Sequence, residues 1–205
     1  MIDNNTEARK QAAMEKQMRK LVLSINVSLD GFADHTVMIA DDELHEFFSG
    51  LLDNTDIALF GRVTYQLMES YWPRAHEDPK ATKSMLDFAD RFNAIPKIVF
   101  SKTLERSEWN KTRLVKRDVP EEIQKLKQLP GKDIVIFGSS DLTVRLIPYN
   151  VIDEYRIMVN PVVLGRGNPL FYGVSDKLNL KLINVRTFRS GNVLLYYQPE
   201  RDKGK

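Results

Sequence analysis

The segment that most constrains this chain is residues 133–142, Asp-Ile-Val-Ile-Phe-Gly-Ser-Ser-Asp-Leu. Its apolar residues 134–137 run directly into Gly-Ser-Ser at 138–140, and an apolar-periodic segment begins at Leu142. This order predicts a buried strand, a tight turn and then a helix. Because a helix N-terminus presents unpaired N–H groups and the positive end of a dipole, a phosphate or pyrophosphate fits such a turn.

A second junction of the same kind lies earlier in the chain. Residues 57–60 (Ile-Ala-Leu-Phe) lead into residues 61–65, Gly-Arg-Val-Thr-Tyr. Plain loop geometry explains either junction, taken singly, about as well as ligand binding does. Two strand–glycine–helix junctions, one of which carries an arginine, together favour a nucleotide-binding cradle.

The composition is that of a globular enzyme. A chain of 205 residues can bury a substantial core. Its net charge of +2 argues against a protein dedicated to nucleic acid. The absence of cysteine excludes disulfides, thiolate metal sites and a cysteine nucleophile. No signal-peptide pattern is present, and no apolar run approaches the roughly 20 residues that span a bilayer. We therefore expect a cytoplasmic protein without a membrane partner.

Basic residues gather in one stretch of the chain. They are Lys102, Arg106, Lys111, Arg113, Lys116 and Arg117. A phosphorylated ligand near this stretch is one interpretation. Acidic residues are interspersed, so a solvated charged face is the preferred explanation for most of the six.

Strand patterns alternate with helix patterns along most of the chain. We predict strands at 21–29, 57–60, 97–101, 114–115 and 134–137, and helices at 44–52, 62–70, 82–92, 120–129 and 142–147. A further strand at 153–160 precedes a hairpin whose strands, 181–188 and 193–197, flank a turn at 189–192. The predicted fold class is α/β, with a mostly parallel central sheet, an antiparallel edge hairpin and helices on both faces. We predict one domain, residues 19–200, preceded by an extension, residues 1–18, that is mobile or helical.

Three other groups of residues are weaker candidates for a site. His35, His45 and His76 are too scattered to form a metal site, so we predict none. The acidic residues 41–43 suggest a cation site, but helix N-terminal electrostatics explain them better. Trp72 either lines a pocket or packs in the core, and core packing is the preferred interpretation.

Several short motifs resemble those of one known fold family. They are residues 28–31 (Ser-Leu-Asp-Gly), 61–65, 96–101 (Pro-Lys-Ile-Val-Phe-Ser), 137–140, the acidic pair 153–154, 161–165 (Pro-Val-Val-Leu-Gly) and 168–171 (Asn-Pro-Leu-Phe). With the final strand pair, the chain from about residue 19 to 199 resembles the dihydrofolate reductase-like fold. Within that fold it is similar to the reductase domain at the C-terminus of the bifunctional riboflavin-biosynthesis protein. The chain has no cysteine and so lacks the zinc-deaminase half; it resembles the stand-alone relatives.

The resemblance implies NADPH as the cofactor, lying across the sheet. The residues that it assigns to the cofactor are Gly61, Arg62, Thr64, Ser101, Lys102, Gly138, Ser139, Ser140, Asp141 and Leu142. The first three would meet the phosphates at a helix start. Ser101 and Lys102 would bind near the adenosine 2′-phosphate, for which hydroxyl donors and fixed cations are suited. The last five would contact the pyrophosphate and the nicotinamide. All these segments lie beyond carboxyl ends of strands, where such sheets bind ligands.

The resemblance also assigns substrate contact or catalysis to Asp30. A carboxylate there would bond ring N–H groups or ribose hydroxyls, or relay a proton to the carbon–nitrogen bond being reduced. We expect it to face the same cavity as Gly61 and Gly138. The alternative is a plain turn role, since Asp30-Gly31 is a turn dipeptide. Residues 32–40 differ from those of the folate and riboflavin enzymes, which leaves the substrate open.

The function predicted from the resemblance is NADPH-dependent reduction. Hydride would pass to a pyrimidine resembling 5-amino-6-(5-phosphoribosylamino)uracil, or to a pterin. The alternative is a non-catalytic NADP(H)-binding or oligomeric protein that keeps the fold without turnover. We also expect a homodimer, formed through the late hairpin or an edge strand.

Overall fold

The computed structural model describes residues 19–34, 38, 40–116 and 118–200. In chain order the elements are β1 (Leu21–Ser28), α2 (Asp42–Asp53), β2 (Thr55–Gly61), α3 (Arg62–Tyr71), η2 (Trp72–Glu77), α4 (Lys83–Ala94), β3 (Lys97–Phe100), β4 (Thr112–Val115), α5 (Val119–Gln128), β5 (Asp133–Phe137), α6 (Ser140–Leu146), η3 (Ile147–Tyr149), β6 (Glu154–Asn160), β7 (Leu180–Thr187) and β8 (Val193–Pro199). The predicted strands and helices are present, each within a few residues of its expected bounds. The predicted extension, residues 1–18, lies outside the described residues.

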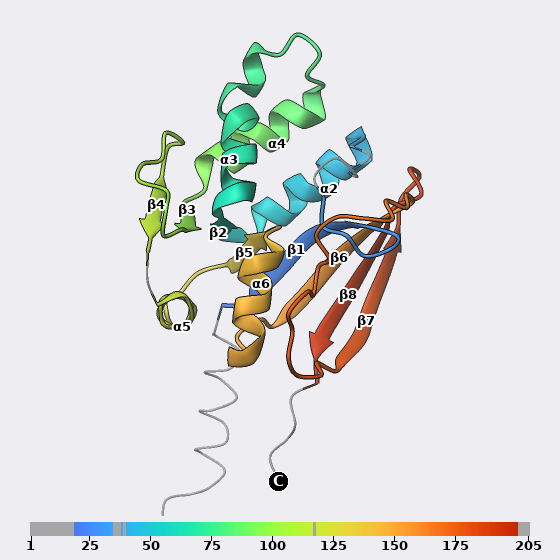
Figure 1. Ribbon diagram of the computed structural model, residues 1–205. Coiled ribbons are helices and arrows are strands. Elements are labelled where there is room, and N and C mark those ends of the chain that lie inside the picture. The colour runs from blue at the N-terminus through green and yellow to red at the C-terminus, as the bar shows by residue number, and fades with distance from the viewer. Residues whose placement is uncertain (1–18, 35–37, 39, 117, 201–205) are drawn as a thin grey trace, which may run out of the picture.

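The strands form one eight-stranded sheet in the order β4-β3-β2-β5-β1-β6-β8-β7. The pairs among β1 to β6 are parallel, whereas β8 pairs antiparallel with both β6 and β7. Figure 1 shows β7 and β8 together at one side of the sheet, with β7 outermost. The prediction of a mostly parallel sheet with an antiparallel edge hairpin is confirmed. β1 lies in the interior of the sheet, between β5 and β6, and nearly all of its residues are buried, which accounts for its apolar content.

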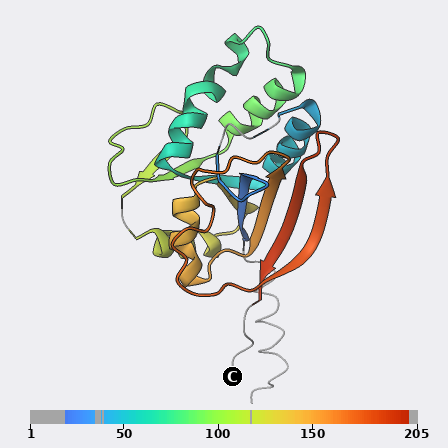
Figure 2. The same ribbon diagram turned by 45° about the vertical axis from the view of Figure 1, so that its right-hand side comes forward.

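Helices cover both faces of the sheet, as the alternation of strand side chains requires. On one face, Leu21 of β1 packs in a cluster with Ile123 of α5 and Leu146 of α6. On the other face, Phe60 of β2 packs in a cluster with Phe92 of α4. The helices α2, α3 and α4 therefore lie on one side and α5 and α6 on the other (Figures 1 and 2).

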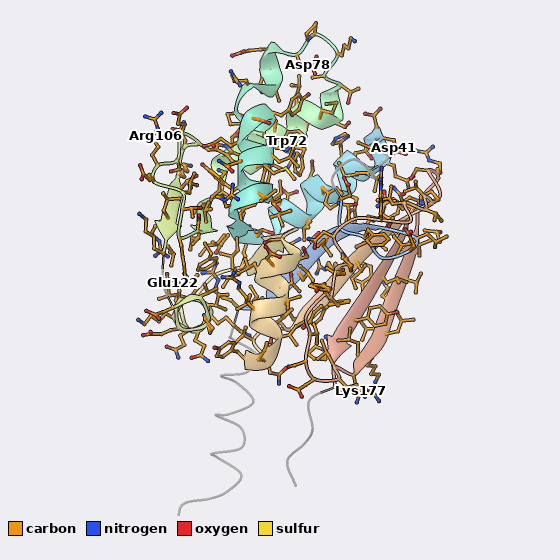
Figure 3. All side chains as sticks on the ribbon, in the orientation of Figure 1. Asp41, Trp72, Asp78, Arg106, Glu122 and Lys177 are labelled. Atoms are coloured by element: carbon orange, nitrogen blue, oxygen red, sulfur yellow. The ribbon has the colours of Figure 1, made fainter. Side chains whose placement is uncertain are left out.

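Trp72 packs in the aromatic cluster beneath α3 and α4. Its ring centroid lies 4.6 Å from that of Phe88, edge to face, and 5.0 Å from that of Tyr71. The indole N–H donates to the sulfur of Met68 at 3.1 Å. Figure 3 shows Trp72 beside α3 and α4, and core packing, the preferred interpretation, is confirmed.

The acidic residues at the start of α2 serve the helix. Asp41 is the N-cap and accepts from the Leu44 N–H at 2.9 Å. Asp42 accepts from the hydroxyls of Thr82 and Ser84, which connects α2 to the start of α4. The helix-terminal interpretation is confirmed. In the described part of the chain, no three potential ligands are grouped to hold a metal, and no helix has the length and apolar content to cross a membrane.

Lys97 is a cation buried at the start of β3, with only 1% of its surface exposed. Its ammonium donates to the backbone carbonyls of Asn93, Ile95 and Asn110 at 2.9–3.4 Å. It also lies 4.4 Å from the ring centroid of Trp109. These contacts replace part of the hydration that the cation loses on burial.

Burial makes the stability of this fold depend on pH through Lys97. Burial lowers the pKa of Lys97 to about 8, and the charge of Lys111 acts in the same direction. In the unfolded chain this pKa stays near 10.5, so between these values the unfolded state binds more protons. The free energy of unfolding should therefore rise as the pH increases from about 8 to 10.5, by roughly 3 kcal/mol at most. Urea unfolding at pH 8 and pH 10, compared with Lys97→Met, isolates this effect, and an equal pH slope in both proteins would contradict it.

Candidate active site

A cavity of about 560 Å³ lies at the carboxyl ends of the parallel strands β1 to β5. Every residue that the sequence assigned to the cofactor lines it. They are Gly61, Arg62, Thr64, Ser101, Lys102, Gly138, Ser139, Ser140, Asp141 and Leu142. The fold thus brings segments from three regions of the sequence to one site, at the position where open α/β sheets bind ligands.

The helix α3 begins at the cavity without a side-chain cap. Its N-cap, Gly61, makes no side-chain cap hydrogen bond, and its first turn carries no acidic residue. Arg62 is exposed and donates to Oε1 of Gln66 at 2.9 Å. An anion at this end of α3 would meet free N–H groups, the positive end of the helix dipole and a guanidinium.

The start of α6 differs from that of α3, because the side chain of Ser139 caps it. Gly138 and Ser139 have φ values of +63° and +66°. In that conformation Ser139 is the N-cap, and its Oγ accepts from the Leu142 N–H at 3.3 Å. Asp141 adds a negative charge to the first turn. A phosphate therefore fits α3 better than α6, a distinction that the two sequence patterns did not give.

The two strand–helix junctions pack directly against each other. A Cβ built on Gly61 would overlap Oγ of Ser139 and lie 3.1 Å from its Cβ. A Cβ built on Gly138 would lie 3.1 Å from Cγ2 of Thr64. Each glycine therefore leaves space for a side chain of the other junction. Gly138 is required by its positive φ as well, whereas Gly61, with φ of −81°, is required by packing alone.

The turn after β3 supplies a hydroxyl and a cation to the cavity. Oγ of Ser101 accepts from the N–H of Leu104 at 2.9 Å and of Thr103 at 3.2 Å, and its hydroxyl proton can be donated to a ligand. Lys102 and Lys116 are exposed and line the same end of the cavity. The acceptor bonds fix the turn and so place the hydroxyl and Lys102 at the cavity.

The other basic residues of this stretch lie elsewhere. Arg106 pairs with Glu108 at 3.5 Å, and Arg113 pairs with Glu122. Figure 3 shows Arg106 on the outer side of the molecule. The solvated-face interpretation holds for these two arginines, and Arg117 lies outside the described residues.

Asp30 does not line the cavity, so the position predicted for it was wrong. Its carboxylate accepts from the N–H of Leu164 at 3.2 Å and of Gly165 at 2.7 Å. A hydrogen bond from Ser28, followed by these N–H groups, lowers the pKa of the Asp30 carboxyl. The turn at Gly31 directs the carboxylate to the loop after β6, which Asp30 holds in place.

The structure adds cavity residues that the sequence analysis missed. Ser24 and Asn26 of β1 line the cavity, and so does Asp34. Oδ1 of Asn26 is buried and has no hydrogen-bond partner among the described residues. A signal was present, because Ser24, Asn26 and Ser28 alternate with apolar neighbours in the strand predicted at 21–29. A period of two marks one polar face.

The segment between β6 and β7 lines the cavity beside the residues that follow β1. The backbone of Asn168 accepts from the Ala33 N–H at 2.8 Å, and its side-chain amide donates to Oγ of Ser140 at 2.5 Å. Phe48 of α2 and Met68 of α3 line the cavity from the opposite face of the sheet. A ligand here would lie between apolar side chains and a small set of polar groups.

Comparison with known proteins supports the same assignment of fold. A putative riboflavin biosynthesis protein from Shewanella sp. PV-4 matches with a TM-score of 0.66 at 21% identity, over 89% of this chain and 99% of that chain. Dihydrofolate reductase from Enterococcus faecalis, solved with NADP(H) and RAB-propyl, matches with a TM-score of 0.58 at 14% identity, over 89% and 97%. The expected dihydrofolate reductase-like α/β fold is confirmed.

Sequence comparison gives the family. The uncharacterized protein YyaP of Bacillus subtilis (strain 168) is 35% identical over 188 residues, which cover 88% of this chain and 95% of that protein. Residues 19–194 match the family described as the RibD C-terminal domain. Since this match spans most of the sequence, the chain belongs to the RibD C-terminal domain family.

Proposed function

We propose that this protein is an NADPH-dependent reductase. Membership of the RibD C-terminal domain family and the dihydrofolate reductase-like fold support a reductase-type function. The observation that carries the proposal is the uncapped start of α3, at Gly61 and Arg62, in the same cavity as Ser101 and Lys102. These groups form a polyanion site of the kind that a phosphorylated dinucleotide needs.

The chemistry of the cavity fits the cofactor along its length. The start of α3 and Arg62 would hold the pyrophosphate, and Ser101 with Lys102 would hold the 2′-phosphate. Asp141, at the capped start of α6, would accept hydrogen bonds from the ribose hydroxyls or from the carboxamide of the nicotinamide. When bound, NADPH supplies a hydride to the substrate. The glycines at 61 and 138 allow the two junctions that line the cavity to pack against each other.

The other end of the cavity would position the acceptor of the hydride. Phe48 and Met68 would exclude water from one side of a flat ring, and Asn26 would accept from a ring N–H. Asp34 replaces Asp30 as the carboxylate able to relay a proton from solvent to the nitrogen of a reduced carbon–nitrogen bond. The acceptor is then a pyrimidine or pterin ring.

The test is direct and separates catalysis from binding alone. NADPH binding is measured by calorimetry, and NADPH oxidation is followed by the absorbance of the reduced nicotinamide with pterin and pyrimidine substrates. Binding with turnover on one of these substrates supports the reductase. Binding without turnover on any of them would favour the non-catalytic NADP(H)-binding alternative, and no NADPH binding would refute both the reductase and that alternative.

We further propose that the protein self-associates through β7. This strand is the outer edge of the sheet, and it exposes Leu182, Ile183 and Val185, each by more than 40%. An exposed apolar edge strand favours pairing with a second copy. Light scattering at micromolar concentration should give the mass of a dimer.

Substitution of one edge residue should separate the copies. Val185→Lys places a charge on β7 and should yield a monomer that keeps its circular dichroism. Leu129→Lys is the matched control, since Leu129 is similarly exposed, at 53%, and follows α5 away from the edge. A monomeric parent protein, or equal effects of the two substitutions, would contradict this interface.

A further inference from the structure

Charge is distributed unevenly along the cavity. Arg62, Lys102 and Lys116 follow β2, β3 and β4, the three strands on one side of β5, and Arg145 lies on α6 after β5. On the other side, the cavity is formed by β1, the residues that follow it, α2 and the loop before β7. We call this part the β1 half; its described lining residues are Ser24, Ile25, Asn26, Ala33, Asp34, Phe48 and Asn168.

The β1 half offers acceptors and apolar walls. None of its described lining residues is a cation. Oδ1 of Asn26 is buried without a partner in the described part of the chain. Such an oxygen is satisfied when a ligand donates to it, and a buried acceptor left unpaired is unfavourable. Ile25 and Phe48 provide apolar surface beside it.

We propose that the β1 half binds an unphosphorylated ring, neutral or cationic, that donates N–H hydrogen bonds, and that it disfavours a phosphorylated pyrimidine. The proposal rests on the proposed function, because the ring is taken as the acceptor of the hydride. A phosphate dianion in this half would lose hydration without a fixed cation to replace it. An amino or ring N–H group would instead pair with Asn26.

The first experiment compares one ligand with and without its phosphate. 5-Amino-6-ribitylaminouracil and its 5′-phosphate are titrated calorimetrically into the protein alone and into its complex with NADPH. Both compounds and the cofactor are then in their reduced forms, so no hydride acceptor is present and no turnover occurs. We expect the unphosphorylated compound to bind at least as tightly as the phosphate ester. Binding of the ester that is about tenfold tighter or more, the strength of a charge-assisted contact, would overturn the proposal.

Two substitutions of Asn26 test its role. Asn26→Leu should weaken binding of the unphosphorylated compound by about tenfold while NADPH affinity stays unchanged, because one buried acceptor is lost. Asn26→Asp keeps an acceptor oxygen and the shape, so it should restore most of the binding. If Asn26→Leu weakened NADPH binding as much as binding of the unphosphorylated compound, the proposal would be contradicted.

The outcomes distinguish this inference from the proposed function. If NADPH fails to bind, the proposed function is refuted, and titration of the two uracils into the protein alone still decides the ligand class. If NADPH binds but neither uracil nor 7,8-dihydropterin binds up to millimolar concentration, the ligand class proposed here is refuted while the cofactor site stands.

Discussion

Gly61→Ala should weaken NADPH binding by roughly 10- to 100-fold, the equivalent of one charge-assisted hydrogen bond at about 1.5–3 kcal/mol. The added Cβ would overlap Oγ of Ser139, the group that caps α6. To relieve the overlap, either Oγ of Ser139 must leave its capping position or the start of α3 must separate from the turn before α6. The backbone conformation at Gly61 is ordinary for alanine, with φ of −81°, so any loss of affinity reflects the contact between the two junctions. Calorimetric titration of NADPH measures it.

Adding Ser139→Gly to the Gly61→Ala variant should restore NADPH binding. Glycine removes the overlapping oxygen and suits the φ of +66° at position 139. It is also an acceptable N-cap, at a cost of only a few tenths of a kcal/mol. The double mutant should therefore bind NADPH nearly as well as Ser139→Gly alone, which is a strong non-additivity. Additive effects of the two substitutions would show that the junctions do not act together.

Lys102→Ala should lower NADPH affinity by about 10- to 100-fold and leave NADH affinity nearly unchanged, because one charge-assisted contact to the 2′-phosphate is removed. Lys102 lies at the end of β3 beside Ser101, and both line the cavity. The parent protein should accordingly prefer NADPH to NADH, and the preference should diminish with added salt because Lys102 is exposed.

Arg106→Ala is the control for this effect. Arg106 belongs to the same basic stretch, but it is exposed, pairs with Glu108 and lies on the outer side of the molecule (Figure 3). Its removal changes the net charge by the same amount without touching the cavity. If Arg106→Ala and Lys102→Ala weaken NADPH binding equally, the loss of affinity comes from the change in net charge and not from a contact between Lys102 and the cofactor. Equal affinity of the parent for NADH and NADPH would refute the 2′-phosphate assignment.

The sequence by itself determined the elements and the turns that line the cavity, because both depend on local patterns. The apolar run at 134–137 and the turn at Gly138 define a strand and its exit within a few residues. The same holds for Gly61 at the end of β2. Since parallel strands present their carboxyl ends at one edge of the sheet, local patterns also predicted that these turns would line one cavity.

The tertiary structure decided what depends on partners distant in the chain. The carboxylate of Asp30 bonds to the N–H groups of Leu164 and Gly165, more than 130 residues away, and no local pattern distinguishes that role from a catalytic one. Asn26 faces the cavity because of the side of β1 on which it lies, and its alternation was hidden within an apolar strand. The cations follow β2, β3 and β4, and only the strand order separates them from the β1 half. Side-chain direction and strand order are properties of the packed sheet, and they determine which ligand the cavity can accept.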